Sequence, residues 1–217
     1  MFDSAPDWIR PIFVEIGKKM TILEAKSEKV AIRKLHNRSD RPRAVLCGGE
    51  LQPRYHPRLV TRLVNFVREG GGTAIFALGF PSFMPMPEFD RLFAEFGLSG
   101  WEHGSYHRTT HMLRSVSTTP PDSPLREILN RGRNHLAAAY SMKALHIARP
   151  GEFEAIYSPT AKSRIESFVF SPDKIEDLKE APVAFAKVGR GWVGYVGDVN
   201  NEAESQTVIL AMLDLLG

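Results

Sequence analysis

The sequence contains a single cysteine, Cys47, among 217 residues. One cysteine excludes an intrachain disulfide framework and is typical of a reducing compartment. Long apolar runs are absent too, and the first residues, MFDSAPDWIRP, lack the basic and then apolar order of a secretory signal. We therefore expect a cytoplasmic protein that does not bind membranes.

Blocks of like charge are also missing. The chain has 28 basic and 25 acidic residues, and the two signs are interspersed along it. The densest basic group has one aromatic neighbour, Tyr140, and is typical of a solvated helix face; it consists of Arg126, Arg131, Arg133 and Lys143. These observations argue against a nucleic-acid partner.

Internal repeats and low-complexity linkers are not found either. A chain of 217 residues with 43% hydrophobic content can bury a sizeable core. We therefore predict a single α/β domain that covers residues 1–217.

The passage from Gly70 to Pro81 carries the strongest local signal. It follows an amphipathic stretch, Pro57 to Glu69, whose apolar residues recur every three or four positions as on one face of a helix. The triple glycine ends this helix, and the short apolar run Thr73 to Leu78 is typical of a buried strand. In doubly wound sheets chemistry collects at the carboxyl ends of strands, so a reactive side chain is expected between Ala77 and Phe80.

Helices and strands are predicted to alternate through the first half of the chain. The expected helices cover Trp8–Met20, Ser27–Leu35, Pro57–Glu69 and Pro85–Phe96, and the expected strands cover Thr21–Ala25, Ala44–Leu46 and Thr73–Leu78. Such alternation indicates parallel strands joined by right-handed crossovers. The predicted fold is therefore a doubly wound, mostly parallel, flavodoxin-like sheet.

The second half is less regular until its end. Extended segments or strands are expected at Ser105–Val116, Ala144–Ile147, Glu152–Tyr157 and Phe168–Phe170, and a helix is expected from Ser123. Two apolar runs, Val183–Val188 and Trp192–Val196, flank Gly189-Arg190-Gly191 and predict a C-terminal hairpin. A final helix from Glu202 follows, with Asn200 or Asn201 as its cap.

Three passages resemble the class I glutamine amidotransferase-like superfamily and, within it, the ThuA-like group. They are Leu46-Cys47-Gly48-Gly49, the stretch from Phe66 to Thr73, and the stretch from Gly191 to Asp198. The resemblance covers roughly residues 21 to 217. It implies a pocket at the strand carboxyl ends that holds a small polar metabolite, such as a carbohydrate-related one.

The chain departs from this family where the family's chemistry is carried out. The resemblance implies a nucleophilic cysteine after the strand Thr73–Leu78 and a histidine and glutamate after the closing strand. This sequence has Ala77 at the first place, and Asp198, Asn200 and Glu202 at the second. Because a thiolate needs a nearby base, glutaminase activity is not expected. The family's first strand is also absent, so either the sheet is shorter or the sequence starts after that strand.

Residues after the strand Ala44–Leu46 offer a different chemistry. Cys47 is a candidate nucleophile for a thiol enzyme, Gly48 and Gly49 offer backbone amides to an anion, and Glu50 is a candidate general base. The competing interpretation is a small buried core cysteine followed by a glycine turn and an exposed glutamate.

His103, His107 and His111 recur every four residues. Glycine, serine and threonine around them favour a strand, where this spacing separates neighbours by about 13 Å and excludes a shared zinc ion. His107 is nevertheless a candidate catalytic residue, with Tyr106 as a neighbouring ligand contact.

Asp198 and Asn200 follow the last strand. We consider Asp198 a candidate base and Asn200 a binding residue, and plain N-capping explains both equally well.

Two classes of function remain open. One is a pocket at the strand ends that binds or transforms a small polar metabolite through Glu50, His107 and Asp198. The other is a non-catalytic interaction module that uses Trp101, Tyr106 and the loop Pro81–Pro87. No metal and no cofactor are predicted, and whether the chain forms a homo-oligomer is left open.

Overall fold

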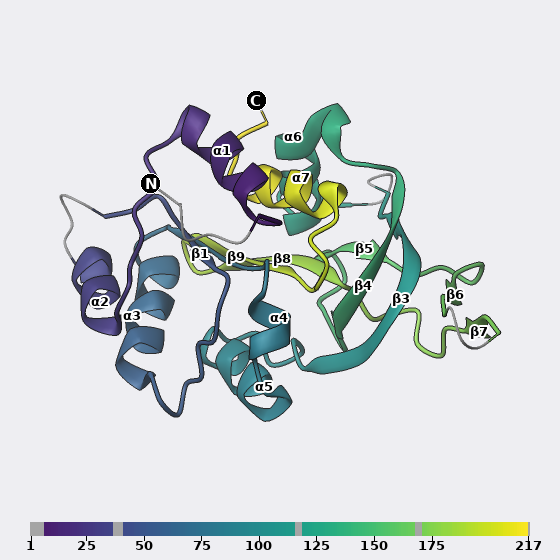
Figure 1. Cartoon of the computed structure of the whole chain (residues 1–217), viewed down its shortest axis with the longest axis horizontal. Helices are drawn as coiled ribbons and strands as arrows, with labels where there is room; N and C mark the ends of the chain where they lie inside the picture. Colours follow the sequence, from purple (N-terminus) through teal and green to yellow (C-terminus); the bar gives the residue numbers. More distant parts are fainter. Residues whose placement is uncertain (1–6, 37–40, 116–118, 168–170, 217) are drawn as a thin grey trace.

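A seven-stranded mixed sheet forms the centre of the computed structural model, which describes residues 7–36, 41–115, 119–167 and 171–216 (Figure 1). Its strands lie in the order β1-β2-β9-β8-β5-β3-β4. Their bounds are Ala44–Cys47 for β1, Thr73–Phe76 for β2, His103–Leu113 for β3, Ala139–Ile147 for β4, Ala155–Ser158 for β5, Val183–Val188 for β8 and Gly191–Val196 for β9. The chain therefore belongs to the α/β class, as the sequence predicts.

Parallel pairing is confined to β1, β2 and β9. β8 runs antiparallel to β9 because only Gly189 and Arg190 join them, and Gly189 has a φ of 57°, which favours glycine. The pairs β5-β8, β3-β5 and β3-β4 are antiparallel as well. The sheet is mixed, with its parallel part at one end.

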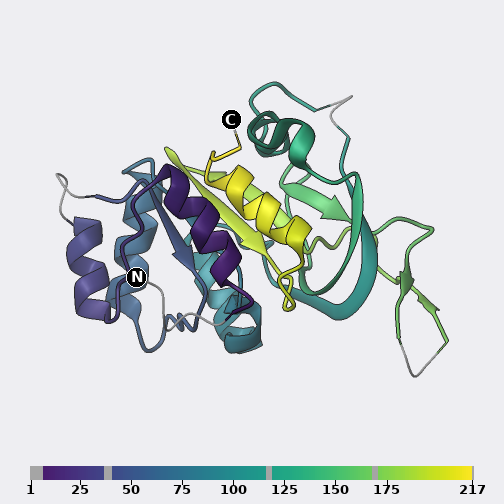
Figure 2. The ribbon, with the colours of Figure 1, turned by 45° about the horizontal axis from the view of Figure 1, so that its top comes forward.

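Helices cover both faces of the sheet, as Figure 1 shows. One face carries α1 (Arg10–Lys19), α6 (Pro124–Gly132) and α7 (Ala203–Met212), and α1 lies beside α7 (Figure 2). The other carries α2 (Glu28–His36), α3 (Pro57–Arg68), α4 (Phe80–Phe83) and α5 (Met86–Glu95). A 3-10 turn, Arg133–His135, follows α6, and two short strands, β6 (Arg164–Ile165) and β7 (Asp173–Lys174), pair outside the main sheet.

None of the helices in the described ranges is both long and apolar enough to cross a membrane.

The helix α3 shows how local sequence builds this arrangement. Pro57 stands at its start, where a missing N–H costs nothing, and its apolar stripe is buried against the sheet. The chain leaves the helix through Gly71, whose φ of 71° explains why glycine is found there. β2 then begins at Thr73 and is buried on both faces.

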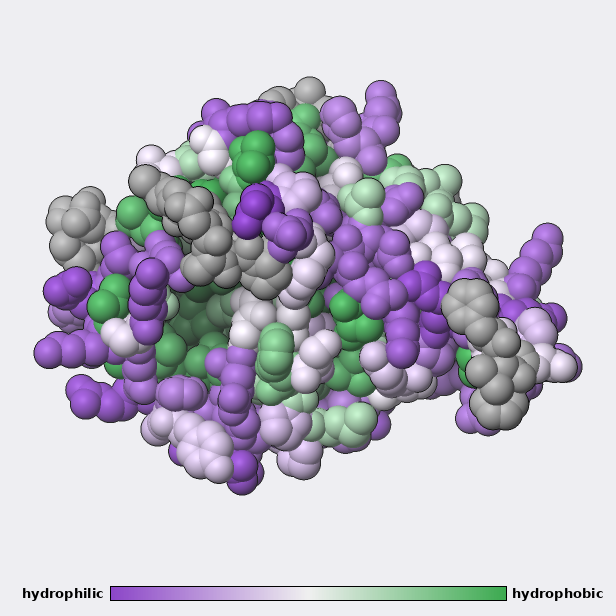
Figure 3. Space-filling view, viewed as in Figure 1, coloured by the Kyte–Doolittle hydropathy of each residue, from purple (hydrophilic) through white to green (hydrophobic). Residues whose placement is uncertain are grey.

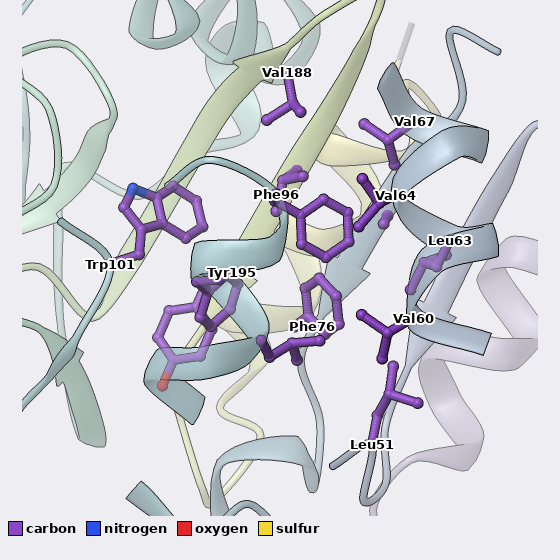
Figure 4. Close-up of a cluster of buried hydrophobic side chains, with 14 of the residues drawn as sticks. Leu51, Val60, Leu63, Val64, Val67, Phe76, Phe96, Trp101, Val188 and Tyr195 are labelled. Carbon is purple, nitrogen blue, oxygen red and sulfur yellow. The ribbon is translucent and has the colours of Figure 1, made fainter. Parts of the chain in front are cut away.

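Each face of the sheet has its own apolar cluster. The cluster beneath α3 and α5 contains a group of packed aromatic rings (Figure 4), namely Phe76, Phe80, Phe89, Phe93, Phe96, Trp101 and Tyr195. The cluster beneath α1 and α7 is built mainly of aliphatic side chains and alanines. Successive side chains of β2 point to opposite faces of the sheet. Phe76 therefore packs in the cluster beneath α3 and α5, and Ile75 packs in the cluster beneath α1 and α7.

The far end of the sheet curls back on itself. β4 pairs with β3, and single bridges also join its residues Ala144 to Asp198 and Ile147 to Ala181. The N–H of Leu145 donates to the carbonyl of Gly197 at 3.1 Å. β4 therefore packs against the chain on either side of the β8-β9 pair.

The fold contradicts the predictions for Thr21–Ala25 and for Trp101. Thr21–Ala25 forms no strand, since the chain leaves α1 there and passes the free edge of β1 without regular pairing. Trp101, expected on an interaction surface, is 1% exposed, and its Nε1–H donates to Glu154. Phe168–Phe170, also predicted as a strand, lies outside the described residues.

Candidate functional site

The carboxyl ends of β1, β2 and β9 lie at one edge of the sheet because the three strands are parallel. The segments 47–50, 77–79 and 197–200 follow these strands. This is the edge at which α/β proteins of this kind hold their ligands.

The turn after β2 has a strained residue and no nucleophile. Leu78 has a φ of 60°, unusual for a residue other than glycine, and stands between β2 and α4. A strand, a strained residue and a helix in this order resemble the geometry that exposes a nucleophile in many hydrolases. Leu78 is 3% exposed and packs beside Gly48, so the turn is filled with hydrocarbon.

Asp198 lies in the turn before α7 and is hydrogen-bonded to the start of that helix. Its carboxylate accepts hydrogen bonds from the N–H groups of Asn200 and Glu202 and from the hydroxyl of Ser205. Burial raises the pKa of Asp198, and these three hydrogen bonds oppose that effect. This favours a structural role for Asp198 in the turn before α7 over a catalytic base. The expected caps Asn200 and Asn201 are wrong, because Glu202 is the N-cap residue and makes no side-chain cap bond.

Cys47 is a poor nucleophile where it stands. Its side chain packs against the cluster beneath α3. Burial raises the pKa of its thiol to about 12, so almost no thiolate exists at neutral pH. Glu50 is exposed, and its carboxylate accepts a hydrogen bond from the side-chain amide of Gln52. Gly48 and Gly49 follow the strand, and Gly48 is packed by Leu78.

We expect Cys47 to resist alkylation in the folded protein. At pH 8, iodoacetamide should modify it at least about a hundredfold more slowly than in the unfolded chain, because the thiolate fraction is so much smaller. Mass spectrometry of timed reactions in buffer and in guanidinium chloride measures the ratio. Equal rates in the two conditions would restore the thiol enzyme as a candidate.

His107 belongs to a buried group of three histidines in the curled part of the sheet. Its ring stacks on that of His146, with centroids 4.5 Å apart, and the Nε2 atoms of His111 and His146 are 2.8 Å apart. His111 and His146 are both 0% exposed. His103 is not part of the group, because its ring faces the carboxylate of Asp90.

The hydrogen bonds define the tautomers of this group. His146 Nδ1 lies 2.9 Å from the carbonyl of Ser105 and must donate to it. A neutral His146 then accepts at Nε2, so His111 donates from its own Nε2 and keeps a bare lone pair at Nδ1. That Nδ1 atom and His107 Nε2 have no hydrogen-bond partner in the described part of the chain.

Electrostatics keep the group neutral. Burial, together with repulsion from the charged forms of His146 and His107, lowers the pKa of His111 to about 2. Burial, with a smaller effect of His107, lowers the pKa of His146 to about 4. Burial also lowers the pKa of His107. Within the described ranges, no set of three or more His, Cys, Asp or Glu side chains is arranged to hold a metal ion.

The residues proposed from sequence therefore do not form one constellation. His107 of β3 pairs with Ala144 of β4, and Ala144 also forms a bridge to Asp198. His107 and Asp198 therefore lie on opposite sides of β4. Glu50 follows β1, on the far side of β2 and β9. Tyr106 is exposed and lies under the ammonium of Lys143.

A groove opens instead along the free edge of β1. It has a volume of about 560 Å³, and its two walls come from opposite layers of the molecule. Figure 3 shows a recessed apolar area in this part of the surface, between the positions of α1 and α3. The larger apolar residues of the lining include Phe13, Ile16, Met20, Ile22, Leu23, Leu35, Leu46, Leu51, Leu59, Leu63 and Leu213. Its charged residues are Glu24, Lys34, Arg41, Arg43 and Glu50, and Cys47 and Gly49 line it near the carboxyl end of β1.

No protein-family model and no curated protein matches this sequence.

Proposed function

We propose that this chain is a non-catalytic binding module, and that its ligand occupies the groove along β1. The groove is the observation that carries the proposal. Its volume of about 560 Å³ lies in the range of ligand pockets, and its lining is mostly aliphatic with a few polar and charged side chains. An aliphatic lining suits an apolar ligand better than the carbohydrate-related metabolite that the resemblance implies.

The same proposal includes a relationship to the class I glutamine amidotransferase-like, ThuA-like group and its flavodoxin-like topology. In its favour are the parallel strands β1, β2 and β9 with helices on both faces, the paired strands β8 and β9 near the C-terminus, and the strained turn at Leu78. In this view the turn is a remnant that has lost its nucleophile, with Ala77 at the position of the family's cysteine and the strained Leu78 directly after it. The other candidate residues have structural tasks: Asp198 holds the turn before α7 through its hydrogen bonds, and Cys47 packs, half-buried, against the core.

The experiment uses 8-anilinonaphthalene-1-sulfonate, a fluorescent apolar anion, as the probe for the groove. Ala31 lines the groove from α2 and is half-buried, so Ala31→Phe fills it. We expect saturable binding to the native protein and at least a tenfold loss of affinity in this variant. Ala94→Phe is the matched control, since Ala94 is exposed on α5 away from the groove.

Thermal unfolding of all three proteins establishes that they are folded at the temperature of the titration. Unchanged affinity in Ala31→Phe would overturn the groove as the ligand site. Glutamine hydrolysis that disappears in Cys47→Ala would overturn the non-catalytic assignment.

A further inference from the structure

The edge of β1 that faces the groove has unpaired backbone groups. The carbonyls of Arg43 and Cys47 accept hydrogen bonds from β2, at 3.3 Å and 3.1 Å. In a parallel pair, alternate residues direct both N–H and C=O to the same neighbour. Ala44 and Leu46 therefore direct theirs away from β2, and no backbone hydrogen bond joins either of them to the described residues beyond the sheet.

The segment 20–26 lies across the groove from this edge. Lys19, before it, donates to the carbonyl of Leu215, next to Asp214, whose carboxylate bonds Arg43 at the amino end of β1. Glu28, after it, contacts His56 at the start of α3, on the carboxyl side of β1. The segment thus passes along the strand and crosses from one helical layer to the other, leaving the groove between itself and β1.

Both walls of the groove are apolar. The side of α1 contributes Phe13 and Ile16, and the side of α2 and α3 contributes Leu35, Leu59 and Leu63. A strand added beside β1 alternates its side chains between these two walls. It would therefore be apolar at consecutive positions, like a strand buried on both faces.

The ends of the groove differ in charge. Lys34, in the last turn of α2, lies toward the amino end of β1 and has no carboxylate partner among the residues described. Arg41 and Arg43 precede β1 at the same end, and Arg43 is already paired with Asp214. Glu24 lines the groove from the segment 20–26. Glu50 lies at the carboxyl end. A strand antiparallel to β1 would bring its own C-terminal side to Lys34 and Arg43, and its N-terminal side to Glu50.

We infer that the groove receives an extended peptide of a partner protein, which adds antiparallel to β1 as an eighth strand. Its chemistry is a basic residue, about four apolar residues and an acidic residue, since β1 is four residues long. The backbone groups of Ala44 and Leu46 bind the peptide main chain, and the two walls select its side chains. This inference rests on the proposed function, because it names the ligand class of the same groove.

Titration of a labelled peptide tests the inference. The probe is Lys-Val-Ile-Val-Leu-Glu-amide with fluorescein joined to its N-terminal amine through a glycine spacer, which leaves the lysine ammonium free, and binding is followed by fluorescence anisotropy. N-methylation of alternate amides on the edge that faces β1 should lower the affinity at least tenfold, whereas N-methylation of the other edge should leave it within threefold. Exchanging the terminal Lys and Glu should also weaken binding.

The matched protein variants are Ala44→Pro and Ala44→Val. Proline removes the N–H of Ala44 and is tolerated at the first position of an edge strand, whereas valine keeps the N–H. We expect the proline variant to bind the peptide at least tenfold more weakly than the valine variant, and 8-anilinonaphthalene-1-sulfonate binding measures in each whether the groove is preserved. Retained binding of the dye together with equal binding of both methylated peptides would overturn the peptide and leave the groove as a ligand site.

Amide exchange by NMR gives an independent measurement. In the free protein, Val45 and Cys47 should exchange slowly, and Ala44 and Leu46 rapidly; the peptide should slow Ala44 and Leu46 at least tenfold. Slow exchange of Ala44 and Leu46 without peptide would mean that this edge is already covered, and would overturn the inference. Displacement of the dye by dodecanoate but not by peptide would assign the groove to an acyl chain instead.

Discussion

Phe93→Ala is expected to destabilise the protein by about 3 to 5 kcal/mol, the usual cost of emptying a large aromatic site. Phe93 is 0% exposed and stands at the centre of the aromatic cluster beneath α5. Its ring packs against five others at centroid distances of 4.8 to 6.4 Å, those of Phe76, Phe80, Phe89, Trp101 and Tyr195.

The surroundings of Phe93 explain the size of this effect. The neighbouring rings come from β2, α4, α5, the loop before β3, and β9, so they are fixed by separate elements and cannot all move into the space left by alanine. A cavity then remains, and its cost adds to the lost transfer energy of the ring. Since domains are stable by roughly 5 to 15 kcal/mol, this one substitution removes a large part of the total.

Urea unfolding followed by tryptophan fluorescence measures the change. The matched control is Phe83→Ala, because Phe83 is 58% exposed and lies only ten residues earlier in the chain. We expect the control to change the free energy of unfolding by less than about 0.5 kcal/mol. Similar losses in the two variants would contradict the assignment of Phe93 to the centre of the core.

The hydrophobic pattern of nearby residues predicts the helices and strands whose apolar positions recur regularly in the sequence. The stripe of α3 and the apolar run of β2 are read from residues close together in the sequence, so both elements were found with bounds within a few residues. β4 is longer than predicted, because its first half, from Ala139, pairs with the long strand β3 and gains its order from that pairing.

The wrong predictions concern features that depend on contacts between residues far apart in the sequence. Thr21–Ala25 has the composition of a strand, but a strand also needs hydrogen bonds to a neighbour, and β1 is separated from it by the groove. Trp101 packs against a ring that belongs to α5, a contact that the residues around the tryptophan do not encode. The open edge of β1 follows from strand order, which local periodicity leaves undetermined.

The candidate site illustrates the same limit. The spacing of His107 and His111 predicts that they lie apart on one strand, and only His107 was a candidate. His146 was missed, because it contacts both of them only through the pairing of β3 with β4. Leu78 was overlooked as well. The sequence Ala-Leu-Gly indicates that no nucleophile is present, but the left-handed φ of the leucine is visible only in the structure.

Acidification is expected to weaken the fold through the buried histidines. In the folded protein the pKa of His146 is about 4 and that of His111 about 2, and in the unfolded chain both are near 6.5. Above pH 6.5 neither state binds these protons. Below it the unfolded chain takes them up first, so the free energy of unfolding falls as the pH decreases from about 6.5 toward 4.

The loss should be on the order of 2 kcal/mol for each of these two histidines at pH 5. Asp198 acts in the opposite direction, because its pKa is raised in the folded state. Its contribution is present at low pH and is lost as the pH rises, so it offsets part of the loss only at the acidic end of this range. A second carboxylate near the histidines is that of Glu180, which accepts hydrogen bonds from the N–H and the hydroxyl of Ser105. The carbonyl of the same Ser105 accepts the hydrogen bond of His146.

Urea unfolding at pH 7, 6 and 5 measures this loss in the native sequence and in His111→Gln. Glutamine can still donate to His146 Nε2 but does not titrate, so we expect the dependence on pH to fall by about half. His36→Gln makes the same replacement at an exposed histidine of α2 and should leave the loss in place. A stability that stays constant from pH 7 to 5, or an identical slope in His111→Gln, would mean that the group accepts protons in the folded state. The neutral hydrogen-bonded arrangement of His111 and His146 would then be wrong.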